Sequence, residues 1–491
     1  MQVLSVSNLF KSSKSNFYFG VLASLIVGLG LFLSFIQPGF IDIDAGIFSA
    51  VALKNLNNGG LYISTWENKP PGLIYLMQAL FFLFSNKVYA LFFLAMFGAL
   101  AISVGVYLLY YKYFESLLIA VLFTTFSLAI IIQPQFFGDG LYTEILGAIC
   151  ILFALVFYDY KSDISNSNYF ICAALAGSSF WFKEPFILAA LVIAFLLFVK
   201  IKNQKERLWL FFWFCVPSIF FILLLFLNGS LTAFVETIIY NFSYVNDTSK
   251  TSFSEKWSLL NQFLFQPVFA VSIAFLVLLY LNLKKGKEIL EIVFFILLLI
   301  SSSGLFMLSP YSFGHYYLPF IIIFFIVFAK LFAIYKKEVK TVNYLLLGLV
   351  LYLSYNTIID LRQPNFVYKI TRYEPDQIAQ KLLEHGDKTL FIDYVNKTEY
   401  YVKGNMVHHA FLPAPLPVHF QTNSKIGQGN IQRIWTEMNA PKADFLITTN
   451  TPAYFYWSLP NHYFYEEFYE KIDSIHKKDD NVMYLWQLKK K

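Results

Sequence analysis

The chain has 491 residues, of which 57% are hydrophobic and only 14% are charged. Because soluble domains carry about 25% charged residues, this composition excludes an ordinary soluble protein and predicts a polytopic α-helical membrane protein. The formal net charge of +6 does not point to nucleic acid, since an excess of Lys and Arg normally marks the cytoplasmic loops of a membrane protein. We therefore expect no nucleic-acid partner.

A transmembrane helix needs about 20 apolar residues, with a usable range of about 17–25. The first apolar stretch, 17–36, is longer than the core of a signal peptide, so we expect a retained transmembrane helix there. The stretch 73–84 is too short to cross and is expected to lie at the membrane interface. In chain order, the eleven predicted spans are 17–36, 88–110, 116–133, 142–158, 166–182, 185–200, 208–228, 263–282, 289–308, 316–334 and 342–359.

The distribution of charge supports these spans. With the N-terminus inside, the loops predicted to face the cytoplasm carry clusters of Lys and Arg, for example at 200–207, 284–287 and 336–340. The loops on the other side, including a large first outer loop at 37–87, are poor in Lys and Arg for their length. Eleven crossings of the cytoplasmic (inner) membrane then place the C-terminus outside.

The composition changes near residue 361, where charged residues return. Three short strand-like runs follow, "KTLFIDYV", "ADFLITT" and "NVMYLWQL", with helical candidates at 375–385 and 430–439. We therefore predict a transmembrane domain over 1–360 and a small extracytoplasmic α/β domain over 361–491.

Charged side chains gather at helix ends on the predicted outer side, where the cost of charge near hydrocarbon makes them candidates for function. Carboxylates can act as a general base or hold a divalent cation, whereas lysines and a histidine can bind a phosphate and stabilise it as a leaving group. A site at the membrane surface suits a substrate with a lipid tail and a phosphate head. The candidates are Asp42, Asp44, Glu67, Asn68 and Lys69 in the first outer loop, Asp139 and Glu144 in the second, Lys183 and Glu184 in the third, and His315 in a later one.

Each candidate taken alone also has a plainer explanation. Asp44 suits the start of a helix, and Glu144 lies in the first turn of its own span, where the helix dipole favours an anion. Lys183 could simply extend its charge to the membrane surface, and a lone histidine such as His315 is more often an ordinary polar group than a ligand. The convergence of both charge signs on one side of the membrane favours a site.

The motif "WENKPPG" contains two prolines directly after Lys69. Pro70 and Pro71 cannot continue a preceding helix, but their fixed φ suits the start of a new one. The motif is therefore predicted to begin a short interfacial helix and to hold Lys69 at a fixed angle to the membrane.

These motifs, in this order, resemble the GT-C glycosyltransferases related to dolichyl-phosphate-mannose–protein mannosyltransferases and to lipid A aminoarabinose transferase. The resemblance covers about 360 residues. Its features are Asp44 with an aromatic residue, Phe48, four positions on, the stretch "GGLYISTWENKPPG", Thr143 with Glu144, "FWFKEP" around Lys183, and "HYYLPF" from His315.

The resemblance implies a GT-C fold and an inverting transfer of a sugar from a polyprenyl-phosphate-linked donor, outside the membrane, to a lipid, glycan or protein acceptor. Asp44 would be the base or key carboxylate, and Lys69 and Lys183 would bind the donor phosphate. Glu144 and His315 would support them. Some relatives bind a divalent metal through an acidic residue directly before the lysine, but Asn68 stands there, so a metal site with Glu67 or His315 is left open.

Two other classes of function remain to be weighed. A transporter or flippase would place ionisable residues near the bilayer midplane and would break helices in matched halves, whereas these spans are almost free of charge in their centres. Another lipid-phosphate enzyme, such as a phosphotransferase or a glycan polymerase, stays open.

Overall fold

The structure is a computed structural model in which the chain divides into two compact units. One comprises 1–36, 94–220 and 250–370, and the other comprises 37–93, 221–249 and 371–491. We call the first the helical unit and the second, because it contains the predicted first outer loop, the outer unit, and describe each by itself. The described residues are 14–36, 41–58, 60–158, 166–247, 252, 254–256, 258, 279, 289–309, 313–336, 377–385, 388–392, 399–408, 443–449, 467–476 and 482–489.

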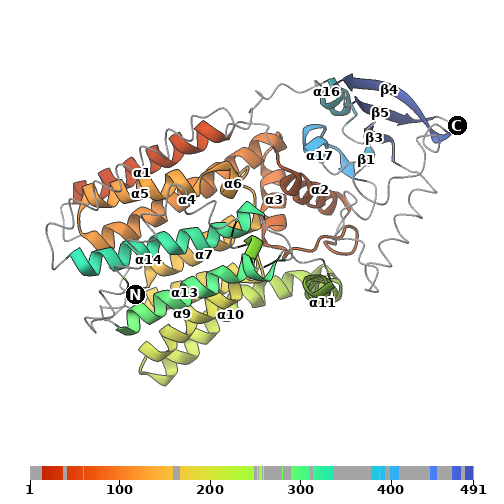
Figure 1. Ribbon diagram of the computed structural model, residues 1–491. Helices are drawn as coiled ribbons and strands as arrows, with labels where there is room; N and C mark the ends of the chain where they lie inside the picture. The colour runs from red at the N-terminus through yellow and green to blue at the C-terminus, as the bar shows by residue number, and fades with distance from the viewer. Residues whose placement is uncertain are drawn as a thin grey trace. The chain divides into compact units, whose positions relative to one another are not determined.

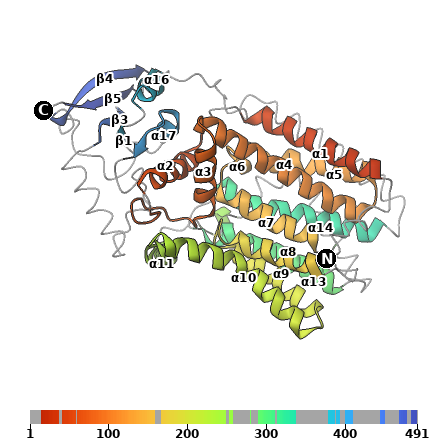
Figure 2. The ribbon, with the colours of Figure 1, turned by 180° about the vertical axis from the view of Figure 1, so that it is seen from behind.

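The helical unit is a bundle of apolar helices (Figures 1 and 2). Its closely packed pairs include α7 with α8, α8 with α9, α1 with α5, and α13 with both α9 and α14. The helices are α1 (Lys14–Phe35), α5 (Leu117–Ile131), α6 (Pro134–Phe137), α7 (Thr143–Phe157), α8 (Asn166–Ser179), α9 (Phe186–Lys200), α13 (Ile289–Leu308), the 3₁₀ helix η2 (Gly314–Tyr317), α14 (Leu318–Lys336), and most of α4 (Lys87–Phe114) and α10 (Gln204–Leu227).

The burial pattern is that of a multi-pass membrane protein. Helix α14 is apolar on all sides and is almost entirely buried, as expected for a helix at the centre of a bundle. Helix α10 is equally apolar but exposes most of its surface, including Phe211, Phe220 and Leu227. Apolar surface of this extent, which would be unstable in water, suits contact with lipid chains.

Nine of the eleven predicted spans coincide with described helices, namely α1, α4, α5, α7, α8, α9, α10, α13 and α14. Among the described residues, four stretches are long and apolar enough to cross a membrane, Asn16–Phe35, Lys87–Phe114, Gln204–Leu227 and Gly314–Ala333, and other apolar helices there are shorter. The predicted spans 263–282 and 342–359 lie outside the described residues, apart from residue 279. The number of eleven crossings therefore stays a prediction.

Lysine side chains bind the carbonyl ends of helices, where a cation complements the helix dipole. Lys112 donates to Tyr158 O at the end of α7, at 2.5 Å. Lys87 donates to Phe84 O at 2.7 Å and also to Phe81 O, at the end of α3 (Gly72–Leu83). These two lysines therefore have a structural role at helix ends.

The outer unit contains three helices from the predicted outer loops: α2 (Ile43–Asn58), α3 and α11 (Leu231–Asp247). Helix α3 has 12 residues and is about 18 Å long, too short for a hydrocarbon core of about 30 Å, as predicted. Helix α11 lies in a stretch expected to be a loop, 229–262. Its buried Phe234, Thr237 and Tyr240 share one face, a pattern that a search for long apolar runs does not detect.

The remainder of the outer unit is a five-stranded sheet with the order β2-β1-β3-β5-β4. Strand β1 pairs in parallel with β2 and β3, and β5 pairs antiparallel with β3 and β4. The elements are α16 (Gln377–Leu383), β1 (Thr389–Ile392), α17 (Glu399–Lys403), β2 (Val407–His408), β3 (Phe445–Thr449), β4 (Tyr469–His476) and β5 (Val482–Leu488).

The three predicted strands correspond to β1, β3 and β5, and the helix predicted at 375–385 corresponds to α16. The helix predicted at 430–439 lies outside the described residues. Strand β4, "YEKIDSIH", was missed because it lies at the edge of the sheet and carries several charged residues, which strand propensity disfavours.

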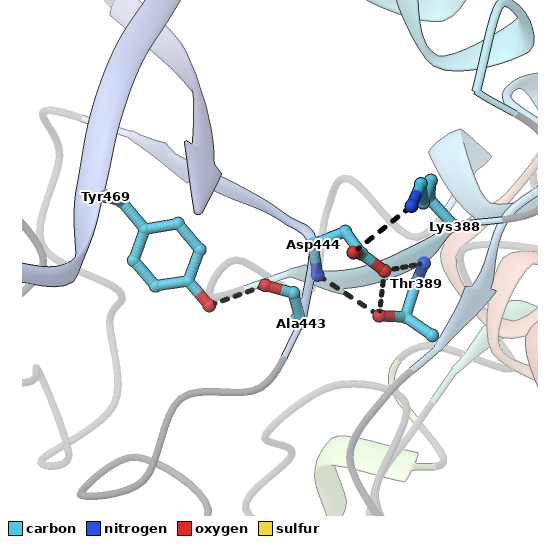
Figure 3. A network of polar contacts seen from close by, with 5 residues as sticks. All are labelled: Lys388, Thr389, Ala443, Asp444 and Tyr469. Carbon is cyan, nitrogen blue, oxygen red and sulfur yellow. Dashed lines mark hydrogen bonds and ion pairs between the residues drawn. The ribbon is translucent and has the colours of Figure 1, made fainter. Parts of the chain in front are cut away.

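Asp444 fastens the start of β3 to the start of β1 (Figure 3). Its Oδ2 accepts hydrogen bonds from the backbone N and the hydroxyl of Thr389, both at 2.8 Å, and its own backbone N donates to the same hydroxyl at 3.1 Å. Tyr469 of β4 donates to Ala443 O at 2.9 Å. One end of the sheet is thereby fixed by side chains as well as by strand pairing.

Helix α2 packs against α17 and β2. Ala50 of α2 is fully buried in the same apolar core as Ile378 of α16, Tyr401 of α17 and Leu485 of β5. A helix of the first outer loop thus helps to form the core of the C-terminal sheet. The predicted domain boundary near residue 360 lies outside the described residues and stays a prediction.

Candidate active site

The first outer loop places Asp42 and Asp44 at the start of α2. Asp42 Oδ1 accepts a hydrogen bond from Ile43 N at 2.5 Å, and Asp42 O accepts one from Gly46 N at 2.8 Å. Asp44 follows within the first helical turn, where the dipole favours an anion, and both carboxylates are half-buried. Asp42 therefore makes the local contacts of the helix start, while Asp44 lies one step further along the same turn.

The segment after α2 folds back on itself before α3 begins. Ile63 N and Ser64 N donate to Gly60 O at 3.0 and 2.9 Å, and the hydroxyl of Tyr62 donates to Lys69 O at 2.6 Å. Tyr62 has a φ of 68°, a left-handed conformation that a bulky side chain rarely adopts. Such a residue persists only where its surroundings hold it, so this loop is fixed by its contacts rather than by regular secondary structure.

Glu67 is buried at the centre of this loop, with 3% of its surface exposed. Its Oε1 accepts hydrogen bonds from Asn68 N at 2.8 Å and Lys69 N at 3.2 Å. Burial raises the pKa of Glu67 to about 7, and the Asp44 carboxylate adds to the rise, while the Lys69 charge and the two backbone donors oppose it. Asp44, Glu67 and Lys69 therefore form one electrostatic group within the outer unit.

Lys69 is held at the boundary between the loop and α3. Its backbone N is bound by Glu67 and its carbonyl by Tyr62, and the residue is half-buried. Pro71 has helical dihedral angles, and its carbonyl accepts a bond from Tyr75 N at 2.9 Å, so α3 starts directly after the two prolines. The predicted start of a short helix at this motif is confirmed.

We expect Glu67→Gln to stabilise the protein at neutral pH. Glutamine keeps an Oε1 acceptor for the two backbone donors but removes the buried charge. Because the folded-state pKa of about 7 exceeds the ordinary glutamate pKa of 4.5, the wild-type protein loses stability as pH rises from about 4.5 to 7, by roughly 3 kcal/mol. The midpoint of thermal unfolding in detergent should thus match wild type near pH 5 and exceed it at pH 8. A variant less stable than wild type at pH 8 would contradict this.

Helix α11 covers the same loop from a distant part of the chain. The side-chain amide of Asn241 donates to Asn68 O at 2.5 Å. Tyr240 packs edge-on against Trp66, with ring centres 5.2 Å apart, and Phe234 lies 5.5 Å from the ring of Tyr62. The sequence analysis did not identify these residues, and their only sequence signal is the spacing of aromatic residues along 231–247.

The helical unit holds a second group, centred on a buried ion pair. Lys183 Nζ lies 3.0 Å from Glu144 Oε1, with the two side chains 9% and 3% exposed. Glu144 is in the first turn of α7, and its Oε2 accepts a hydrogen bond from Thr143 Oγ1 at 3.0 Å. Lys183 therefore does not extend to the surface, and the explanation of its charge by snorkelling does not apply.

The position of Lys183 follows from the tight turn between α8 and α9. Lys183 N donates to Ser179 O at 3.2 Å, and Phe186 N donates to Lys183 O at 3.1 Å, so the chain turns sharply within a few residues. Burial alone would lower the pKa of Lys183, but the charge of Glu144, with Tyr316 and Glu184, outweighs it and raises the pKa above its usual value. The neighbouring charges therefore favour the protonated, charged form of Lys183.

His315 lies in η2 and is close to two aromatic rings. The rings of Tyr142 and His315 are stacked with centres 4.1 Å apart, and the ring of Phe313 lies nearly parallel to His315 at 5.7 Å. The next residue, Tyr316, lies under the Lys183 ammonium group, which is 5.2 Å from its ring centre. The helical unit thus brings Glu144, Lys183 and the His315 segment together; their role in a site stays a prediction.

Asp139 lies in the turn that leads into α7 and is 1% exposed. Its Oδ1 accepts a hydrogen bond from Leu141 N at 3.0 Å. The neighbouring Gly140 has a φ of 84°, and a Cβ there would lie 2.7 Å from that of Ala95. Asp139 therefore shapes the turn before Tyr142 and Glu144.

Lys256 is a buried lysine that the sequence analysis did not single out. Its Nζ donates to Met307 O at 3.0 Å and Ser309 O at 2.5 Å, at the end of α13, and Tyr317 donates to its carbonyl at 3.2 Å. It fastens the end of α13 beside η2, and it lies in a predicted loop with no motif to mark it.

The residues with described positions do not assemble a metal site. Within these ranges, no group of three or more His, Cys, Asp and Glu side chains could hold a metal ion. Glu67, proposed as a ligand, already uses Oε1 to bind two backbone N–H groups. We therefore derive no step through a metal.

Comparison with known proteins identifies the fold. No protein-family model and no curated protein matches the sequence. The crystal structure of ArnT from Cupriavidus metallidurans bound to undecaprenyl phosphate matches 96% of this chain and 98% of its own, with a TM-score of 0.61 and 10% sequence identity. The apo structure of the same protein matches the same shares, with a TM-score of 0.59 and 12% identity. The predicted GT-C fold is therefore confirmed.

Proposed function

We propose that the protein is an inverting glycosyltransferase that moves a sugar from a polyprenyl-phosphate-linked donor to an acceptor on the extracytoplasmic side of the inner membrane. The observation that carries the proposal is the likeness of its fold to ArnT, which was solved with undecaprenyl phosphate, over 96% of the chain. Because one fold can host several functions, the proposal also depends on the charged residues of the outer loops.

In the proposed reaction, Asp44 accepts the proton of the acceptor hydroxyl while that oxygen attacks the anomeric carbon of the sugar. The bond between this carbon and the donor phosphate oxygen breaks, and polyprenyl phosphate leaves with the bonding electrons. Attack from the face opposite the phosphate inverts the anomeric centre. Lys69 offers a positive charge to the leaving phosphate, and we propose the same role for Lys183.

The remaining candidates have supporting roles in this proposal. Glu144 keeps Lys183 charged and oriented through the 3.0 Å ion pair, and the His315 segment supplies the aromatic ring under the same ammonium group. Glu67 binds the backbone of the loop that carries Lys69. The acceptor is a lipid, a glycan or a protein.

Product analysis tests the proposal. The full-length protein in detergent is incubated with an undecaprenyl-phosphate-linked sugar carrying a label, together with membrane extract as a source of acceptors. We expect free undecaprenyl phosphate and a labelled acceptor that has gained the sugar without phosphorus. Transfer of the sugar with its phosphate would indicate a phosphotransferase, and a ladder of products on the lipid would indicate a polymerase. An unchanged donor would contradict transfer altogether.

A further inference from the structure

The C-terminal sheet makes a buried polar contact with the loop that carries Lys69. His408, the last residue of β2, is 1% exposed, and Thr65 of the loop is fully buried. His408 Nε2 and Thr65 Oγ1 are 3.1 Å apart and share a hydrogen bond, although 343 residues separate them in the chain. If the loop moved away from His408, the buried Thr65 hydroxyl would lose this hydrogen bond, which costs free energy. The contact therefore constrains the loop.

The loop depends on such contacts because its own secondary structure is minimal. The only pairing described within it is an isolated bridge between Leu61 and Thr65. Thr65 lies two residues before Glu67 and four before Lys69, so a shift at Thr65 is transmitted along a short stretch of chain. Trp66, between them, is itself buried against Tyr240.

The same sheet also fixes the helix that carries Asp44. Ala50 of α2 is part of the core formed by α16, α17 and the sheet, and α2 packs against β2, which ends at His408. The ring of His408 lies beside that of Tyr401 of α17, with centres 5.8 Å apart. The elements that carry Asp44 and Lys69 therefore both make buried contacts with the C-terminal segment, α2 through the sheet core and the loop through Thr65.

We propose that His408 is a positioning residue for the donor phosphate site: through Thr65 it holds the loop at the angle at which Lys69 meets the phosphate. This gives the C-terminal segment a part in donor binding. The inference rests on the proposed function, because it assumes that Lys69 binds a polyprenyl phosphate.

The test measures binding of undecaprenyl phosphate to the full-length protein in detergent. Thr65→Val keeps the shape of the side chain and removes only the hydroxyl, so we expect affinity to fall about tenfold, as for a displaced binding group. Thr65→Ser restores the hydroxyl and should restore affinity. Ser64→Ala is a matched control on the same loop: its hydroxyl donates to Gly60 O at 3.2 Å, within the loop itself, and the variant should bind like the wild type.

A double variant separates positioning from general destabilisation. If Thr65 acts through Lys69, Thr65→Val will cause no further loss of affinity in a Lys69→Ala background. Normal binding by Thr65→Val, or losses that add fully in the double variant, would overturn the inference while leaving the proposed function intact. Normal binding by Lys69→Ala would instead overturn the assumed role of Lys69 and the inference with it.

Discussion

Asp44→Asn is expected to reduce sugar transfer by a factor of about 10² to 10⁴, the usual contribution of a general base. Asparagine has nearly the same size as aspartate but cannot accept the proton of the acceptor hydroxyl. The rate should be measured with a saturating polyprenyl-phosphate-linked donor, so that a loss reports on the chemical step. Binding of undecaprenyl phosphate should persist, because Lys69 is unchanged.

The alternative role of Asp44 predicts a different result. As a first-turn anion, Asp44 would contribute only about 0.3–1 kcal/mol to stability and nothing to the rate. The substitution also removes a negative charge that raises the pKa of Glu67, which offsets part of that loss. Glu236→Gln, which neutralises an exposed carboxylate on α11, is the matched control. Full activity of Asp44→Asn would show that the carboxylate serves only the helix end.

Much of the fold could be predicted because membrane helices have a strong local signal. Apolar runs located α4, α9 and α13 within a few residues, and the prolines of "WENKPPG" located the start of α3. In each case the physical cause lies within the segment itself, either the cost of exposing backbone to lipid or the fixed φ of proline.

The contacts that define the candidate site could not be predicted in the same way. Glu144 and Lys183 were each selected for their charge at a helix end, but their pairing depends on how α7, α8 and α9 pack. His408 was not selected, since nothing near it in the sequence distinguishes it from other polar residues. Long-range packing, rather than local propensity, brings these groups to their partners.

The contacts of aromatic residues could not be predicted from the sequence either. With 56 Phe and 33 Tyr in the chain, an individual ring carries little information in the sequence. In the structure, the rings of Tyr142 and Phe313 are each stacked with His315, and Tyr316 lies under Lys183. The contact of the Lys183 ammonium group with the Tyr316 ring, together with the ion pair to Glu144, offsets part of the cost of burying that charge.

The second large expected effect is the loss of stability when the buried Lys183–Glu144 ion pair is broken. Lys183→Met is expected to destabilise the protein by about 3–5 kcal/mol, because it leaves the Glu144 carboxylate buried without its counter-ion. Thermal unfolding in detergent measures this loss. Lys205→Met, which removes an exposed lysine near the start of α10, should change stability by less than about 0.5 kcal/mol.

The double variant Lys183→Met/Glu144→Gln decides what the pair is for. With both charges removed, no ion is left buried, and stability should recover to within about 1–2 kcal/mol of the wild type. If Lys183 binds the donor phosphate, this stable variant will still bind undecaprenyl phosphate weakly and transfer sugar slowly. If the pair only joins α7 to the turn before α9, activity will return together with stability. Because the double variant removes the folding defect, its activity reports on the chemical contribution of the pair rather than on stability.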